Sequence, residues 1–350
     1  MRRTIITAIT LLTTLLLVSV SIGTSQAKGL KLQHGDTTVT SIRFTPDGAK
    51  FASASFNGTV VMWNAISGER VWYFDLDEKS RTKDRYTISH IFDMDISSEG
   101  STLAISYSQS SVIGETLQAG AVERIALIDA KNGQVTKTLA GRGVLAFSPR
   151  DESLLWLSND QIAQLWNVKT EQNIQQIKLK AGADSLVFSP DGKQFVIAIG
   201  PGWDTHPESI VGLYDSETGK LLREFPRQYS QVTGIAFSRD GKYLLIGGFN
   251  TPCVTTKLWN LSLPNSQESE TILAGEKGLV GNYAYSPDGK LLAYGECQRG
   301  RQMVSIMELS ANKKVRSYKL NAEAKSLAFS PDGTHLAIGT TEGQITLATL

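Results

Sequence analysis

Phe44-Thr45-Pro46-Asp47-Gly48 is a five-residue stretch that recurs along the whole chain. Clear copies begin at residues 188, 237, 285 and 329, and two worn copies begin at residues 96 and 147. Neighbouring copies begin between 41 residues (147 to 188) and 52 residues (44 to 96) apart. A unit of this length that occurs seven times predicts a repeat architecture, in which each unit packs against its neighbours.

Each unit predicts four short antiparallel strands. The residues before the marker, such as 39–44, alternate between polar and apolar, which is typical of a half-buried strand. Proline and glycine then favour a tight turn, because proline restricts φ and glycine accepts positive φ. A second strand follows the turn, and a third ends on a large apolar residue followed by Asn, Asp or Glu. Six units carry this ending: Trp63-Asn64, Ile128-Asp129, Trp166-Asn167, Tyr214-Asp215, Trp259-Asn260 and Met307-Glu308.

The period, the turn and the ending of strand three together resemble the WD-repeat β-propeller family over residues 30–350. The resemblance implies an all-β fold, a single seven-bladed β-propeller of four-stranded antiparallel blades covering residues 28–350. The family's Gly-His pair is missing except for His34, and the aspartate of the second hairpin is replaced, for instance by Asn57. We therefore expect no side-chain tetrad of the WD type. Packing of the strand-three aromatics should hold the blades instead: Trp63, Trp166, Tyr214 and Trp259.

The two ends of the repeat region predict how the ring closes. The last unit stops after its third strand, residues 345–350, and residues 30–33 precede the first strand of the first unit. We expect this N-terminal strand to complete the last blade, because a closed ring leaves no sheet edge exposed. A closed ring needs no partner copy, so a monomer is expected.

The N-terminus has the order of a secretory signal. Arg2 and Arg3 are basic, residues 4–27 carry no charge, and Ser25 and Ala27 are small residues at the positions a signal peptidase reads. We expect residues 1–27 to be a signal peptide and the protein to be exported to the periplasm or the cell exterior. The alternative is an uncleaved membrane anchor over residues 4–27, which would be the protein's only contact with the membrane.

The net charge argues against a nucleic-acid partner, and the two cysteines raise the question of a disulfide. Lys plus Arg is 35 and Asp plus Glu is 34, so no basic field exists to hold a nucleic acid. Cys253 and Cys297 fall in predicted loops between strands two and three of adjacent blades. A disulfide can form in an exported protein, so the two cysteines either pair or remain two free thiols.

Arg43 and Asp95 occupy the position just before the marker aromatic in neighbouring units, where the other units have small apolar residues. An unpaired buried charge would be costly, so we expect the two side chains to pair across the blade interface.

Four long insertions lie between strands two and three or between blades, in residues 75–86, 106–124, 200–208 and 298–302. In a propeller these connections share one face, and such a loop face commonly carries the binding function. Trp203 and His206 are the strongest candidates for a binding hot spot, because an amphipathic aromatic side chain lies beside a polar one in the sequence. The candidate binding residues are Trp203, Asp204, His206, Arg85, Tyr86, Arg299 and Arg301.

Enzyme motifs are missing from the sequence. The four histidines are scattered, no Cys-x-x-Cys or zinc spacing occurs, and neither a Gly-x-Ser-x-Gly elbow nor a P-loop is present. Asp93 and Asp95 could suggest acid–base work, but Arg43 explains Asp95 better. We therefore expect no catalytic residue, cofactor or metal.

The resemblance to WD-repeat proteins implies a non-catalytic scaffold for a protein or peptide. The alternatives are a propeller enzyme of the dehydrogenase, lactonase or hydrolase type, and a small-ligand or sugar binder.

Overall fold

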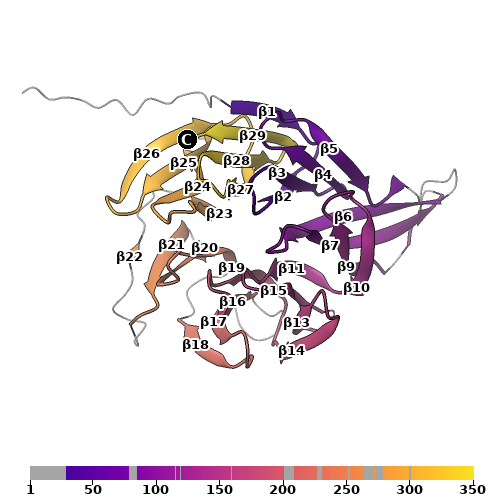
Figure 1. Ribbon diagram of the computed structural model, residues 1–350, viewed down its shortest axis with the longest axis horizontal. Helices are drawn as coiled ribbons and strands as arrows, with labels where there is room; N and C mark the ends of the chain where they lie inside the picture. The colour runs from indigo at the N-terminus through magenta and orange to yellow at the C-terminus, as the bar shows by residue number, and fades with distance from the viewer. Residues whose placement is uncertain are drawn as a thin grey trace, which may run out of the picture.

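The computed structural model describes residues 29–350 except 79–84, 115, 119, 159, 201–208, 227–230, 251–252, 264–270, 273–278 and 299–300. It describes only the backbone of residues 85, 249–250, 253–255, 271–272, 279–282, 297–298 and 301. Seven antiparallel sheets stand side by side in a ring, as predicted (Figure 1). Among the described residues, no helix is long and apolar enough to cross a membrane.

Blades 1 to 3 are formed by consecutive strands. Blade 1 contains β2 (Val39–Phe44), β3 (Lys50–Ser55), β4 (Thr59–Asn64) and β5 (Arg70–Asp75). Blade 2 contains β6 (Arg85–Ile96), β7 (Thr102–Ile113), β8 (Thr116–Leu117), β9 (Val122–Asp129) and β10 (Val135–Ala140). Blade 3 contains β11 (Arg142–Phe147), β12 (Ser153–Leu157), β13 (Ile162–Asn167) and β14 (Gln172–Lys178).

Blades 4 to 7 repeat the same order. Blade 4 contains β15 (Ala183–Phe188), β16 (Gln194–Ile199), β17 (Ile210–Asp215) and β18 (Leu221–Phe225). Blade 5 contains β19 (Gln231–Phe237), β20 (Tyr243–Asn250), β21 (Cys253–Asn260) and β22 (Thr271–Ile272). Blade 6 contains β23 (Leu279–Tyr285), β24 (Leu291–Gln298), β25 (Arg301–Glu308) and β26 (Lys313–Lys319). Blade 7 contains β27 (Ala324–Phe329), β28 (His335–Thr340), β29 (Gln344–Thr349) and β1 (Gly29–Gln33).

The ring closes through strands from both ends of the sequence. β1 pairs antiparallel with β29, with Lys31 opposite Thr346, and so supplies the fourth strand of blade 7. The amide of His34 then donates to the carbonyl of Gly343 at 2.9 Å. This is the closure that the sequence predicts, and within the described ring it leaves blade 7 with four strands like its neighbours.

The marker turn is built by its own hydrogen bonds. In blade 1, Thr45 Oγ1 donates to Asp47 Oδ1 at 2.5 Å, and the amide of Ala49 donates to the same oxygen at 3.0 Å. Gly48 has a φ of 70°, a value that side chains with a Cβ disfavour. Donors to the carboxylate lower its pKa, as they do at the matching aspartates: Asp191, Asp240, Asp288 and Asp332.

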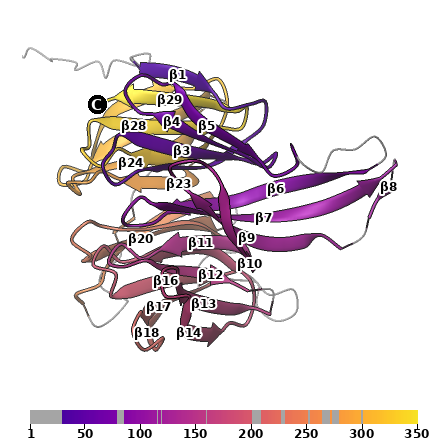
Figure 2. The same cartoon turned by 45° about the vertical axis from the view of Figure 1, so that its right-hand side comes forward.

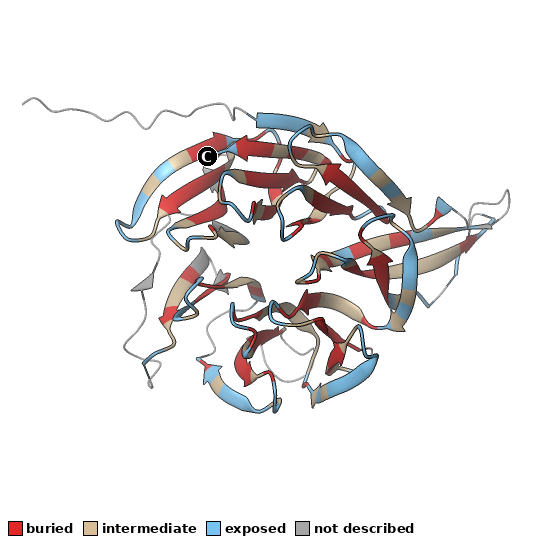
Figure 3. Cartoon of the chain, in the orientation of Figure 1, coloured by how far each residue is buried: buried red, intermediate tan, exposed pale blue. Residues whose placement is uncertain are grey.

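The hydrophobic core lies between blades. Among the described residues, buried apolar side chains form seven clusters, and each cluster joins two neighbouring blades. The first strands β2, β6, β11, β15, β19, β23 and β27 surround the axis and contact one another in turn. The outer strands β5, β10, β14 and β18 are largely exposed (Figure 3). A single blade therefore cannot bury its own faces, which explains why the sequence repeats the whole unit.

The strand-three aromatics pack in these clusters. Trp63 stacks on Phe51 with ring centroids 6.3 Å apart, and Tyr214 stacks on Phe195 at 5.4 Å. The edge of Trp166 meets Trp156 at 6.2 Å, and Trp259 meets Phe225 at 5.5 Å. All four of these strand-three side chains are buried, so their packing contributes to holding neighbouring strands and blades together.

The expectation that no blade carries the side-chain tetrad is wrong for blade 1. Trp63 Nε1 donates to Ser53 Oγ at 2.8 Å, and Ser53 Oγ lies 2.6 Å from His34 Nδ1. His34 Nε2 lies 2.8 Å from Thr59 Oγ1, which donates to Asn57 Oδ1 at 2.7 Å. The asparagine accepts the hydrogen bond as an aspartate would, so the replacement does not break the network. Burial lowers the pKa of His34 to about 4.

Candidate functional site: the arm of blade 2 and the central channel

Most of the predicted binding residues cannot be placed. Trp203, Asp204, His206 and Arg299 lie outside the described residues. Arg85 begins β6 and Arg301 begins β25, but their side chains are not described. Tyr86 is the one predicted residue whose side chain is described, and it is exposed on β6.

The two cysteines lie in strands, which corrects the prediction that they fall in loops. Cys253 begins β21 and Cys297 lies near the end of β24, opposite Gln302. Both strands extend further toward the loop face than the repeat predicts. The side chains of both cysteines lie outside the described residues, so a disulfide and two free thiols both stay as the predicted alternatives.

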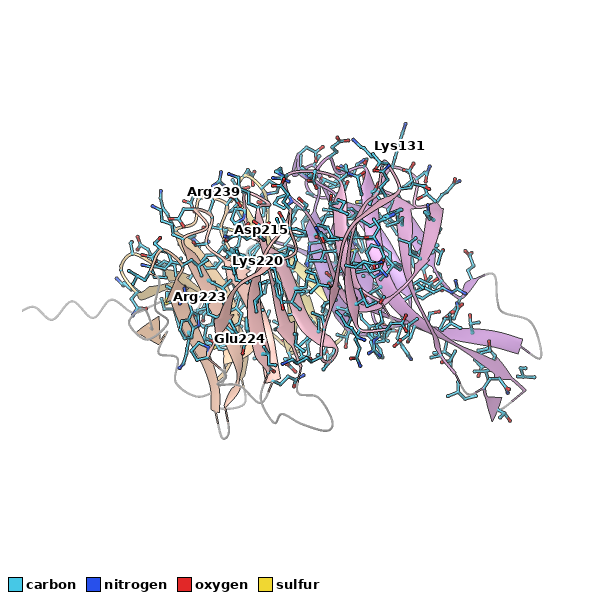
Figure 4. The ribbon with its side chains drawn as sticks, turned by 90° about the horizontal axis from the view of Figure 1, so that it is seen from below. Lys131, Asp215, Lys220, Arg223, Glu224 and Arg239 are labelled. Carbon is cyan, nitrogen blue, oxygen red and sulfur yellow. The ribbon has the colours of Figure 1, made fainter. Side chains whose placement is uncertain are left out.

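The insertion in blade 2 forms an arm, where the sequence suggested loops. β6 and β7 each run for 12 residues, and they pair from Arg85 opposite Ile113 to Ile96 opposite Leu103 with one bulge between Ile91 and Asp93. Short β8 pairs with the end of β7. The strands project from the ring on the side where strands two and three are connected (Figure 2). Lys131 and Arg239, in turns at the other ends of the strands, lie on the opposite face (Figure 4). We call residues 85–92 and 106–124 the arm.

The arm exposes apolar side chains. Leu117 is 61% exposed, Ile113 49%, Val122 46%, Tyr86 39% and Ile88 37%. Residues 86–92, 102–114, 116–118 and 120–122 contain no Lys, Arg, Asp or Glu. The outer strand β26 of blade 6, by contrast, contains four basic residues among seven. The charged residues Arg85, Glu123 and Arg124 lie beside this stretch, and an exposed apolar surface of this kind is a candidate interaction site.

One buried carboxylate fixes the base of the arm. Asp77, only 5% exposed, accepts hydrogen bonds from Thr87 Oγ1 at 2.5 Å and from the amide and hydroxyl of Ser89 at 2.9 and 2.7 Å. Gln109 Nε2 also donates to Ser89 Oγ at 3.0 Å. These bonds occupy the polar face of β6 and tie it to the connection from blade 1. The alternate residues Tyr86 and Ile88 point to the other face.

The exposed face continues from the arm to the axis of the ring. The ring of His90 stacks on Phe56 with centroids 4.3 Å apart, and His90 Nδ1 lies 3.1 Å from the carbonyl of Phe56. Phe92 follows at a bulge in β6, is exposed, and lines the central channel. Arm and channel therefore form one continuous surface.

The channel is a cavity of about 650 Å³ lined by the seven first strands. Its charged lining residues are Arg43, Asp93 and Lys325, and Lys325 pairs with Glu323 at 2.8 Å. Thr233 lines the channel, and its buried hydroxyl has no hydrogen-bond partner. Thr233 and Phe92 both lie at bulges at the arm-side ends of their strands.

Arg43 and Asp95 pair across the interface of blades 1 and 2, as the sequence led us to expect. Arg43 Nε donates to Asp95 Oδ1 at 2.9 Å. Asp95 Oδ2 also accepts the amide of Phe147 at 2.8 Å, and Asp93 accepts the amide of Leu145 at 3.3 Å. Burial raises the pKa of Asp93, and the nearby charge of Arg43 opposes that shift. The carboxylates thus join blades 1, 2 and 3, and their hydrogen bonds suit a brace better than proton transfer.

Asp184 is a further carboxylate on a first strand, at the bulge of β15. Its Oδ2 is buried without a hydrogen-bond partner, and burial raises its pKa to about 6. Its other oxygen faces the backbone of Gly200, where a Cβ would come within 2.8 Å. Among the described residues, no three His, Cys, Asp or Glu side chains converge on a metal site.

Comparisons with known proteins match two segments of the repeat region. The fold is a seven-bladed β-propeller, and the family model described as WD domain, G-beta repeat matches residues 28–64 and 219–251. The first match covers all residues of the His34 network. The chain is similar to Pre-mRNA-processing factor 19 of Oryza sativa subsp. japonica, 25% identical over 63% of this chain and 41% of the relative.

Two further relatives cover more of the chain. A Periodic tryptophan protein 2 homolog of Dictyostelium discoideum is 23% identical over 90% of this chain and 40% of the relative. Eukaryotic translation initiation factor 3 subunit I of Drosophila erecta is 23% identical over 76% of this chain and 93% of the relative. The chain thus spans about two fifths of the length of the first two relatives.

Proposed function

We propose that this chain is an exported, non-catalytic scaffold that binds a protein partner through the arm of blade 2. The observation that carries the proposal is the group of exposed apolar side chains on the projecting strands of the arm. WD-repeat relatives whose names place them in pre-mRNA processing and translation initiation support a role in binding proteins. Export rests on the composition of residues 1–27, which lie outside the described residues.

The described part of the channel supports a binding role over a catalytic one. Its hydroxyl-bearing residues are not accompanied by a histidine, and its acidic residue Asp93 is engaged by backbone amides and by Arg43. A general base needs a free lone pair directed at a substrate, and Asp93 offers little of that kind.

The test is affinity capture from the native envelope fraction with three baits. The first is the unaltered protein, the second carries Tyr86→Ser and Leu117→Ser, and the control carries Ile174→Ser and Leu222→Ser. The control residues are similarly exposed on the outer strands β14 and β18. Losing two partly exposed apolar contacts should cost about 2 kcal/mol of binding, roughly thirtyfold in affinity.

A protein retained by the unaltered and control baits and lost by the arm variant supports the proposal. Equal capture by all three baits would place the binding surface elsewhere and overturn it, as would the absence of any captured protein. Equal melting temperatures of the three baits show that the arm variant is folded.

A further inference from the structure

We propose that the crevice between blades 5 and 6, on the face opposite the arm, binds a small molecule that combines a flat aromatic ring with a carboxylate. The crevice lies apart from the arm, so this inference goes beyond the proposed function and does not depend on it. Two departures from the repeat meet there. They are a short residue, Thr271, on the outer strand of blade 5, and Arg239 in the marker turn of the same blade (Figure 4).

Each blade has one outer-strand residue at a shared register position. It lies opposite the residue that precedes the last apolar residue of strand three, as Trp72 lies opposite Met62 in blade 1. The other blades have these residues at the same position: Lys137, Gln175, Arg223, Thr271, Arg316 and Leu30. The seven blades can therefore be compared at the place where each meets the next.

Six of these seven residues have long side chains, and each of the six contacts the next blade at or just after the end of strand three. Trp72 Nε1, for example, donates to the carbonyl of Ala130 at 3.0 Å. The other contacts are N–H donation from Gln175 to the carbonyl of Glu217 at 2.9 Å, from Arg223 to that of Leu263 at 3.3 Å and from Arg316 to that of Thr349 at 2.9 Å, the pair of Lys137 with Glu171 at 2.6 Å, and Leu30 beside Gly68. A long side chain thus spans the crevice between those blades.

Blade 5 departs from this pattern. Thr271, whose backbone alone is described, is the shortest of the seven residues. A cavity of about 690 Å³ lies between blades 5 and 6, and its apolar walls are Tyr243, Leu258, Tyr285 and Leu309. The matching cavity beside Trp72, between blades 1 and 2, is about 470 Å³, and its described lining lies in residues 45–50, 99–101 and 129–131. The cavity at blade 5 is thus larger, extends inward to Leu258 and the marker aromatic Tyr285, and has a volume typical of small-molecule sites.

The walls suit an indole-sized ring with one hydrogen-bond donor. Trp72 shows what fills the matching space in blade 1, because its indole packs on the core between blades 1 and 2 and its N–H reaches Ala130. Leu309 takes the place of Ala130 in blade 6, two residues after the last apolar residue of strand three. Its carbonyl accepts the amide of Asn312 at 3.3 Å and has a second lone pair to offer. The two tyrosine rings in the walls add aromatic packing surface, so a ligand ring would replace the side chain that blade 5 lacks.

Arg239 supplies a positive charge at the rim. It is exposed, and the other clear copies of the marker turn have proline at its position: Pro46, Pro190, Pro287 and Pro331. In the described part of the chain no carboxylate forms an ion pair with Arg239, since Asp240 lies 4.0 Å from Lys242 and Asp288 lies 3.5 Å from Lys290. These three cations and two carboxylates leave a net charge of +1, which favours an anionic group beside the ring.

The test is isothermal titration calorimetry of the purified full-length protein with three probes: indole-3-acetate, indole and acetate. We expect indole-3-acetate to bind a single site at concentrations below about 5 mM, indole to bind about threefold to fivefold more weakly, and acetate not to bind. Arg239→Ala should weaken indole-3-acetate binding about threefold to fivefold and leave indole binding unchanged. The control, Arg150→Ala, removes an exposed arginine from the marker turn of blade 3 and should change neither.

Thr271→Trp tests the cavity itself. The introduced indole should span the crevice as Trp72 does in blade 1, and it should weaken binding of both ring-bearing probes at least about tenfold. The melting temperature of this variant should be unchanged or higher, because the added ring fills a cavity.

Several results would overturn the inference. They are no binding of indole-3-acetate, an Arg239→Ala variant that loses no more affinity than Arg150→Ala, and unchanged binding by folded Thr271→Trp. Binding of a peptide that ends in tryptophan, without binding of the free probes, also contradicts a small-molecule site. If Thr271→Trp does not fold, the two arginine variants decide. Capture of a partner through the arm does not involve this crevice, so failure here leaves the proposed function standing.

Discussion

The His34 network makes a quantitative prediction about acid. Because Thr59 donates its hydroxyl proton to Asn57, His34 donates to Thr59 from Nε2. Ser53 Oγ accepts from Trp63 and keeps its own proton to donate, and His34 Nδ1 at 2.6 Å is the acceptor beside it, so the neutral ring is the form that fits. The folded pKa of about 4 is below the value of 6.5 in the unfolded chain. Between pH 4 and pH 6.5 the His34 ring is mostly protonated in the unfolded chain and mostly neutral in the folded protein. The contribution of His34 to stability is thus complete above pH 6.5 and is lost as the pH falls toward 4.

The size of the effect follows from the two pKa values. A difference of about 2.5 units at 1.36 kcal/mol per unit gives about 3 kcal/mol in total, of which about 2 kcal/mol is lost by pH 5. The assay is urea unfolding followed by tryptophan fluorescence at pH 7.5, 6, 5 and 4.5. The comparison is with His34→Gln, which has no titrating ring at this position.

The variant should be less stable at pH 7.5, by about 2 kcal/mol, because Ser53 and Thr59 lose their hydrogen bonds to the His34 ring. Its disadvantage should shrink toward zero as the pH falls to 5. Taking the difference between the two proteins removes the titration of all other groups. If the two unfolding free energies stay parallel from pH 7.5 to 4.5, the reasoning about His34 is refuted.

Three further predictions concern the hub and the ring. Asp184→Asn should gain about 1–2 kcal/mol of stability relative to the unaltered protein as the pH rises from 4 to 6, because the raised folded pKa makes the buried acid resist ionisation. Urea unfolding of both proteins at these pH values checks it, and a difference between them that does not change with pH contradicts it. Arg43→Leu should cost about 1–2 kcal/mol by leaving Asp95 uncompensated, and Asp95→Asn in the same chain should recover part of that cost; additive effects in the double-mutant cycle would show no coupling. Deleting residues 28–36 should lower the melting temperature by about 10 °C or more, because β29 loses its partner and His34 is removed; an unchanged melting temperature would rule out the closure.

The ring was predictable because the signals that define it are local and repeated. A turn in which a Ser or Thr hydroxyl bonds to Asp two residues later, as at Ser330 and Asp332, recurs in five of the seven units. The end of strand three is equally local, and the unpaired strand at each end of the repeat region predicts the closure. The pairing of Arg43 with Asp95 was predictable because both depart from the pattern at the same position of adjacent units.

The arm and the His34 network were missed for different physical reasons. The arm was assigned to loops because the repeat sets the expected strand length, and β7 exceeds it. A signal existed in the uncharged alternation of Tyr86 and Ile88 with Thr87 and Ser89, which is the pattern of a strand. The network was missed because Asn57 replaces an acid, whereas a hydrogen-bond acceptor was all that Thr59 required.

Blade 7 contains strands from both ends of the described chain, and this also determines when folding can finish. Lys31 pairs with Thr346, so the first described strand has no strand to pair with until the last one, β29, has formed. Contacts this distant in sequence form slowly, and during synthesis blade 7 stays open until the rest of the chain has emerged. If residues 1–27 direct export, this delay would keep the chain unfolded while it crosses a membrane. The ring would then close only on the far side, where its partner is expected.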